Sequence, residues 1–187
     1  MLLDSLKDFS WDNEPADVCF NENGMVVQSE PETDFWQSLP HNIHRDNGHF
    51  FFTRKNGDFR LVVHWRFEQA EAADQCGIML RIDSLNWVKA GFLSSDMRMP
   101  QLGSVVTTNG TSDWAVWPLV SVPQDIWLKA VRKGKNFLLF ASIDGQNFRQ
   151  LRMFALPNVK NELRCGAYIC SPQKHNFSAT LVSIEQF

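Results

Sequence analysis

The sequence predicts an all-β protein in which two antiparallel sheets pack face to face as a sandwich, with residues 1–187 forming a single domain. Three observations support this prediction. Apolar and polar residues alternate along most of the candidate strands, as expected for strands with one buried face. Turn residues such as Gly134 and Asp144-Gly145 separate these strands at short intervals. No long segment has the period of an amphipathic helix.

The clearest alternation is in residues 58–68, where the odd-numbered positions are apolar. Further strands are expected at residues 25–30, 49–54, 75–83, 86–94, 126–133, 136–143, 148–154, 165–171 and 177–187. The turn at Asp83–Asn86 makes residues 75–83 and 86–94 antiparallel neighbours. The residues expected to fill the core are Phe59, Leu61, Val63, Trp65, Ile78, Leu80, Leu128, Leu139 and Ile143.

Composition narrows the function classes. The net charge is −3 at pH 7 and the Lys and Arg residues are scattered, so no basic surface for nucleic acid is predicted. No apolar stretch approaches a membrane span, and the N-terminal residues lack the features of a secretory signal. We therefore expect a cytoplasmic protein with four reduced, buried or half-buried cysteines, Cys19, Cys76, Cys165 and Cys170. The sequence does not indicate an oligomeric state.

Several stretches, in this order and across most of the chain, resemble the DUF1349 family. They are Asp34-Phe35-Trp36, Asp74-Gln75-Cys76-Gly77, Trp87-Val88-Lys89-Ala90-Gly91, Val105-Val106-Thr107, Ser112-Asp113-Trp114 and Cys170-Ser171-Pro172. The resemblance implies a concanavalin A-like jelly roll, in a family with fungal members named for regulation of enolase and relatives appended to glycoside hydrolases. Where the family often carries an acidic residue after Trp-x-Lys-x-Gly, this chain has Phe92, so a role for that carboxylate is not carried over.

The predicted site lies on the sheet face opposite the core. Strand parity places Trp87 and Lys89 on the face of residues 86–94 that turns away from the core. By the same argument Arg81 and His64 stand on that face of two preceding strands. If these strands are neighbours, a ring, two cations and an imidazole line one concave surface, which suits a polar ligand that stacks on the ring. The alternative is a solvated face on which a loop covers the Trp.

Other candidate ligand-binding residues surround this surface. Asp113 and Trp114 are expected in a loop that could close over it, and Gln75 begins a strand beside it. Gly77 and Gly91 have no side chains and would leave room above the sheet for a ligand. The alternatives are a Trp that plugs the end of the sandwich and polar residues that only form turns. Asp34-Phe35-Trp36 is expected to be a structural corner in which the Trp packs inward.

We therefore predict binding of a carbohydrate or another small polar ligand, with no cofactor, metal ion or catalytic residue. His41, His44 and His49 lack other ligands at zinc spacing, and no convincing pair of carboxylates has the arrangement of a glycosidase site. Two alternatives remain open. One is a protein-interaction or regulatory domain, as the name of the fungal relatives implies. The other is an enzyme for a sugar-like substrate with His64 or Asp113 as base.

Overall fold

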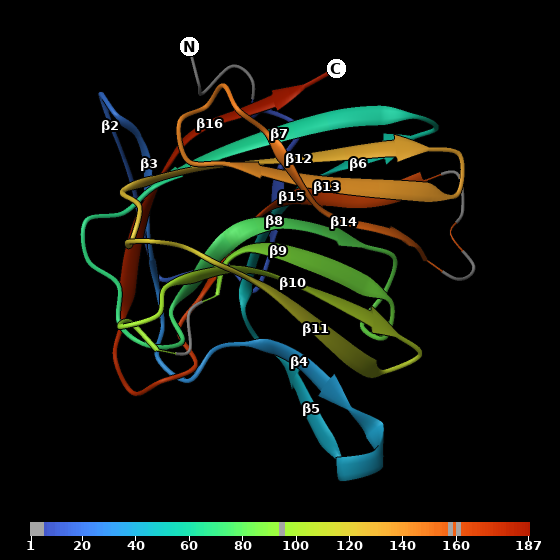
Figure 1. Ribbon diagram of the computed structural model, residues 1–187, viewed down its shortest axis with the longest axis horizontal. Coiled ribbons are helices and arrows are strands. Elements are labelled where there is room, and N and C mark those ends of the chain that lie inside the picture. The colour runs from blue at the N-terminus through green and yellow to red at the C-terminus, as the bar shows by residue number, and fades with distance from the viewer. Residues whose placement is uncertain (1–5, 94–95, 157–158, 160–161) are drawn as a thin grey trace.

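The computed structural model describes residues 6–93, 96–156, 159 and 162–187. These residues form a two-sheet sandwich, with β7, β12 and β13 in one layer and β8 to β11 in the other (Figure 1). The elements are β1 (Ser10–Asp12), β2 (Asp17–Asn21), β3 (Gly24–Ser29), β4 (Phe35–Ser38), η1 (Leu39–His41, a 3₁₀ helix), β5 (Ile43–Asp46), β6 (His49–Asn56), β7 (Phe59–Arg66), β8 (Gln75–Arg81), β9 (Trp87–Leu93), β10 (Gln101–Thr108), β11 (Thr111–Pro118), β12 (Asp125–Lys133), β13 (Asn136–Ser142), β14 (Arg149–Ala155), β15 (Glu162–Cys170) and β16 (Phe177–Gln186). The predicted fold class is confirmed. Within the described ranges, no helix has the length and apolar character needed to cross a membrane.

The two sheets share the chain in an interleaved order. The larger sheet has nine strands in the order β1-β6-β15-β8-β9-β10-β11-β4-β5, and the smaller has seven in the order β14-β13-β12-β7-β16-β3-β2. The strands β15 and β16 therefore lie in the interior of the two sheets, although they come last in the sequence. The chain crosses from the smaller to the larger sheet between β7 and β8.

The predicted core residues meet between the sheets, as expected from strand parity. Phe59 is 6% exposed and Leu61, Val63 and Trp65 are at most 1% exposed. Ile143 is the exception, because it is 57% exposed. The strand β13 ends one residue earlier, and Ile143 points outward at the start of the following turn.

The cysteines also follow the parity argument, with one correction. All four thiols are free, and Cys165 and Cys170 face opposite sides of the larger sheet. Cys19 is exposed rather than buried, because β2 is the edge strand of the smaller sheet.

A second correction concerns Asp113 and Trp114, because the loop expected to carry them is a strand of the β-hairpin formed by β10 and β11. Asn109 and Gly110 have φ angles of 49° and 75°, the positive values that a tight two-residue hairpin turn needs. Thr108 and Thr111 pair directly across this turn. Trp114 therefore lies on strand β11 and not on a flexible loop.

The larger sheet curls around the face that it turns away from the smaller sheet. Tyr168 on β15 and Phe35 on β4 are five strand steps apart in the sheet order, which would be about 24 Å in a flat sheet. Their ring centroids lie only 6.4 Å apart. This concave face carries its own buried cluster, which comprises Phe35, Phe50, Phe52, Met79, Trp87, Leu93, Val105, Tyr168 and Cys170.

Candidate functional site

A pocket of about 290 Å³ opens on the concave face. The strands β11 and β4 pair only at Thr111 and Ser38, and the pocket lies where the two strands separate. The amide of Gln37 donates to the hydroxyl of Ser112 at 3.0 Å, which holds β4 at this distance. We call this site the aromatic pocket. It is lined by Asp34, Trp36, Ala73, Gln75, Lys89, Leu93, Val105, Trp114 and Pro172.

One end of the aromatic pocket is polar and almost inaccessible to water. Lys89 is 1% exposed, and its ammonium donates to Asp34 Oδ1 at 3.0 Å and to Gln75 Oε1 at 2.7 Å. The backbone amide of Phe35 donates to the same Asp34 oxygen at 2.8 Å. A buried cation of this kind is stable only if it is paired and hydrogen-bonded. The three side chains thus form one connected polar group inside an otherwise apolar pocket.

Three glycines on adjacent strands lie near this polar group. Gly77, Gly91 and Gly103 are register partners on β8, β9 and β10. The hydrogen bond between Lys89 and Gln75 crosses the first two of them, because Gln75 pairs with Leu93 and Lys89 with Met79. A Cβ at Gly77 would lie 2.0 Å from the backbone oxygen of Ala90, and one at Gly91 would lie 2.1 Å from that of Cys76, so these two glycines allow the close approach of β8 and β9 rather than leave room for a ligand. A Cβ at the third glycine would lie 2.8 Å from the indole Nε1 of Trp114.

Two tryptophans form the other walls. Trp114 is 43% exposed on β11, and Trp36 is half-buried on β4 and packs against the concave-face cluster. Asn47 Oδ1 accepts from the amide of Asp34 at 3.0 Å, which fixes the start of β4. An exposed indole beside a buried polar group is suited to a ligand with both an apolar face and hydrogen-bonding groups.

The structure brings together three of the seven residues that the sequence analysis proposed, namely Gln75, Lys89 and Trp114. Trp87 shares their sheet face, as predicted, but is 0% exposed. Phe35 packs edge-on against its ring at 6.1 Å. Trp87 therefore offers no surface for stacking, and the expectation of an exposed platform at this position is wrong.

Arg81 pairs with Trp87 across β8 and β9, as expected from the turn at Asp83–Asn86. However, the Arg81 side chain is also buried. It is 6% exposed and donates two hydrogen bonds of 2.6 Å to the carboxylate of Asp46 on β5. This bidentate pair fixes the returning hairpin against the sheet. Arg81 does not line the aromatic pocket.

His64 belongs to the other sheet, so its expected place on the same face is wrong. Strand β7 pairs with β12 and β16, not with β8. His64 stacks on Trp127 with centroids 3.9 Å apart and is 2.6 Å from Asp125 Oδ1. Burial lowers its pKa, against the raising effect of the Asp125 hydrogen bond and charge.

Asp113 likewise lies outside the pocket. It neighbours Trp114 on β11, and adjacent residues of a strand point to opposite faces. Its carboxylate is 72% exposed and accepts from Arg152 Nη2 at 2.8 Å. The acidic residue Asp34 and the aromatic residue Trp36 also line the pocket. They were not among the predicted ligand-binding residues, because their segment was interpreted as a structural corner. Their even spacing was the available signal, since residues i and i+2 of a strand share a face.

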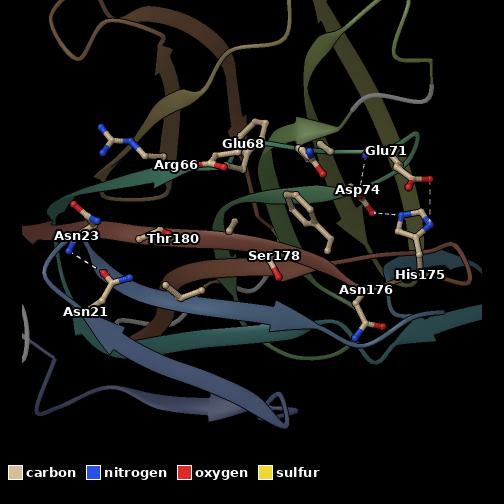
Figure 2. Close-up of a pocket in the computed structure, with 16 residues that line it drawn as sticks. Asn21, Asn23, Arg66, Glu68, Glu71, Asp74, His175, Asn176, Ser178 and Thr180 are labelled. Carbon is tan, nitrogen blue, oxygen red and sulfur yellow. Dashed lines mark hydrogen bonds and ion pairs between the residues drawn. The ribbon is translucent and has the colours of Figure 1, made fainter.

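A second depression lies beside β16, at the connection between β7 and β8 (Figure 2). This polar cleft has a volume of about 610 Å³ and is lined mainly by polar side chains. His175 Nε2 is 2.9 Å from Asp74 Oδ1, and Ser171 donates to the same oxygen at 2.8 Å. The amide of Glu71 donates to the other Asp74 oxygen at 2.8 Å. The buried Asp74 therefore connects three segments of the chain.

Two buried thiols and a buried phenol near the pocket are held in their neutral forms. Burial raises the pKa values of Cys170, Cys76 and Tyr168, and a protonated thiol is a poor nucleophile. The Tyr168 hydroxyl is buried without a hydrogen-bond partner in the described part of the chain. In the same part, no three His, Cys, Asp or Glu side chains are grouped to hold a metal ion.

Comparison with known families places the chain by sequence. The model of the family described as protein of unknown function (DUF1349) matches residues 11–186. The chain belongs to this family. A relative from Saccharomyces cerevisiae, Regulation of enolase protein 1, is 31% identical over 172 residues, which cover 91% of this chain and 85% of that relative.

Solved structures agree with the fold of this DUF1349 protein. A functionally unknown protein from S. cerevisiae has a TM-score of 0.89 at 27% identity, with 97% of each chain covered. The carbohydrate binding module CBM66 from Bacillus subtilis has a TM-score of 0.61 at 13% identity, with 97% and 96% covered. The GH43 protein BlXynB from Bacillus licheniformis has a TM-score of 0.77 at 13% identity, and the match covers 36% of that longer chain.

Proposed function

We propose that this protein is a carbohydrate-binding domain that holds its ligand in the aromatic pocket. The observation that carries the proposal is the position of the exposed Trp114 ring beside the buried group of Lys89, Asp34 and Gln75. A sugar ring combines an apolar face of C–H groups with an edge of hydroxyls, and these two surfaces match an indole and a polar group. Among the described residues of the lining, only Asp34 and Lys89 are charged, and their charges cancel.

The comparisons support this proposal at the level of the fold. One similar structure is a carbohydrate binding module, and others are glycosidases in which a domain of this shape forms about a third of the chain. The aromatic pocket contains one carboxylate, Asp34, which is engaged with Lys89. Glycosidases of the common type need two carboxylates. The pocket therefore supports binding better than hydrolysis.

The proposal is tested by a thermal-shift screen of neutral, acidic and amino sugars, followed by calorimetric titration of the hits. Replacing Trp114 with Ala removes the stacking surface, and we expect an affinity loss of about 1–3 kcal/mol. The fold should be unaffected because the ring is 43% exposed. Val116→Ala is the matched control, since Val116 lies on the same strand, is 52% exposed and is outside the pocket. Equal sugar affinity in Trp114→Ala and wild type would refute the proposal.

A second candidate function is protein interaction or regulation. One observation favours it: in the described part of the chain, β11 pairs on the β4 side only at Thr111, and Trp114 and Val116 on this edge are exposed. An open strand edge can pair with an extended segment of another protein. The name of the yeast relative is consistent with such a role. A screen in which no sugar raises the melting temperature would favour this alternative.

A further inference from the structure

The polar end of the aromatic pocket has hydrogen-bonding capacity that the protein does not use. A Lys ammonium has three donors, and two of those of Lys89 are directed to Asp34 Oδ1 and Gln75 Oε1. Within the described residues, one Lys89 donor therefore has no acceptor. Lys89 lines the pocket although only 1% of its surface is exposed, so an acceptor that contacts this donor would be bound in a low-dielectric site.

Asp34 and Gln75 have open positions as well. Both described hydrogen bonds to Asp34 use Oδ1, from Phe35 and Lys89, and Oδ2 accepts none from the described residues. The only described hydrogen bond of the Gln75 side chain uses Oε1. Its amide nitrogen has no described partner and is not among the buried unpaired atoms, so it can be reached from the pocket.

The open positions are two donors, on Lys89 and Gln75, and one acceptor, on Asp34. A hydroxyl group both donates and accepts, so two neighbouring hydroxyls match the pattern: each accepts from Lys89 or Gln75, and each can donate to Asp34 Oδ2. Lys89 and Asp34 compensate each other's charge, so a charged ligand group would gain little net attraction from the pair. Such a group would also lose its hydration on entering a site shielded from water.

Size limits the ligand further. The volume of about 290 Å³ is at the lower end of small-molecule sites, and Trp114 and Trp36 border the remaining space. One sugar ring fits between the polar end and these indoles, with its apolar face toward a tryptophan.

We infer that the aromatic pocket binds one neutral sugar ring through a vicinal diol, which Lys89, Asp34 and Gln75 hold while Trp114 contacts the apolar face of the ring. This inference rests on the proposed carbohydrate-binding function and specifies its chemistry. It predicts selection by ligand charge and by the position of two adjacent hydroxyls.

The test uses the wild-type protein and varies the ligand, so no variant has to fold. Methyl glycosides of xylose, arabinose, glucose, galactose, mannose and fructose are titrated by calorimetry, together with methyl glucuronide and methyl glucosaminide. For the tightest neutral sugar, each hydroxyl is then replaced by hydrogen in turn. Loss of either of two adjacent hydroxyls should weaken binding about tenfold to a hundredfold, the range for hydrogen bonds to charged groups. Loss of any other hydroxyl should change affinity less than about threefold.

A protein variant locates the effect in this pocket. Gln75→Met keeps the side-chain length and leaves Asp34 paired with Lys89, but removes both the side-chain donor and the Oε1 acceptor of Lys89. It should weaken the parent sugar about tenfold but bind the corresponding deoxy sugar as wild type does. Gln69→Met is the matched control, because Gln69 lines the polar cleft instead.

The outcomes separate the inference from the proposed function. Tighter binding of the glucuronide or the glucosaminide than of every neutral sugar would overturn the diol inference and leave carbohydrate binding intact. Equal sensitivity to all hydroxyls would do the same. Binding of no sugar would refute the proposed function together with the inference.

Discussion

The aromatic pocket and the polar cleft differ in how far their polar groups are already satisfied. The cleft is about twice as large, at about 610 Å³ against 290 Å³, and has many more polar residues. However, Asp74 accepts three hydrogen bonds within the protein, and Arg66 donates to Asp125 at 3.0 Å. In the aromatic pocket, Lys89, Asp34 and Gln75 all have capacity left. Donors and acceptors without a protein partner, next to an exposed aromatic ring, therefore indicate a binding site better than the size or the polarity of a pocket does.

The largest predicted loss of stability is at Asp34. Removing this carboxylate in Asp34→Ala leaves Lys89 as a buried cation without a counter-charge, which should cost about 3–5 kcal/mol of unfolding free energy. Sugar binding should be lost as well. Urea denaturation measures the stability change.

Asp113→Ala is the control for this prediction. Asp113 also pairs with a cation, but its carboxylate is 72% exposed, so its loss should cost at most about 1 kcal/mol. Similar small losses in both variants would mean that water reaches Lys89, and the aromatic pocket would not be the dry site described above.

The second largest loss of stability is expected in the polar cleft, where the hydrogen bonds of Asp74 should contribute to stability but not to ligand binding. In Asp74→Asn an amide replaces one acceptor oxygen, so a donor from Ser171, His175 or Glu71 loses its partner. We expect a stability loss of about 1–3 kcal/mol and unchanged sugar affinity. Stability is measured by urea denaturation and affinity by calorimetry.

Glu68→Gln serves as the reference for the cleft, because Glu68 is exposed and lines it without a described partner. It should change neither property. Loss of sugar binding in Asp74→Asn at full stability would assign the ligand to the cleft and reverse the roles of the two sites.

The smallest predicted effect on stability concerns His64, which lines neither the aromatic pocket nor the polar cleft. Burial lowers its pKa in the folded protein, so the unfolded chain binds more protons below its pKa of about 6.5. The resulting stability is present above that pH and is lost as the pH falls through the folded pKa. Urea midpoints at pH 7.5 and 5.5 should therefore differ more in wild type than in His64→Phe, which keeps a ring on Trp127. Identical pH dependence in both proteins would contradict this.

Strand parity predicted local geometry well, since it depends only on which residues alternate. It correctly placed Ile78 and Leu80 inside and put Trp87 and Lys89 on the opposite face. It could not show that Phe35, more than fifty residues earlier, covers Trp87. Exposure on the concave face depends on how far the sheet curls, and no local pattern encodes that.

Sheet membership was a second limit. His64 and Arg81 have the same kind of outward parity, but β7 and β8 belong to different sheets, so a shared face was inferred where none exists. Trp114 was identified for its polar neighbours although its loop is a strand, and Gln75 was placed correctly at the start of β8. Asp34 was missed because its role depends on a contact with Lys89, fifty-five residues away.

The positions of β15 and β16 have a consequence for how this protein is made. β15 separates β6 from β8, and β16 separates β7 from β3, so neither sheet has a complete interior until residues 162–186 have left the ribosome. Before then, β6 and β8 both expose an unpaired edge where β15 will bind, and such edges are prone to wrong pairing. The nascent chain must wait for its final strands, and these pairings between distant residues favour slow folding. A chain that stops short of residue 162 lacks one interior strand of each sheet, so premature termination should yield an aggregation-prone product rather than a smaller folded domain.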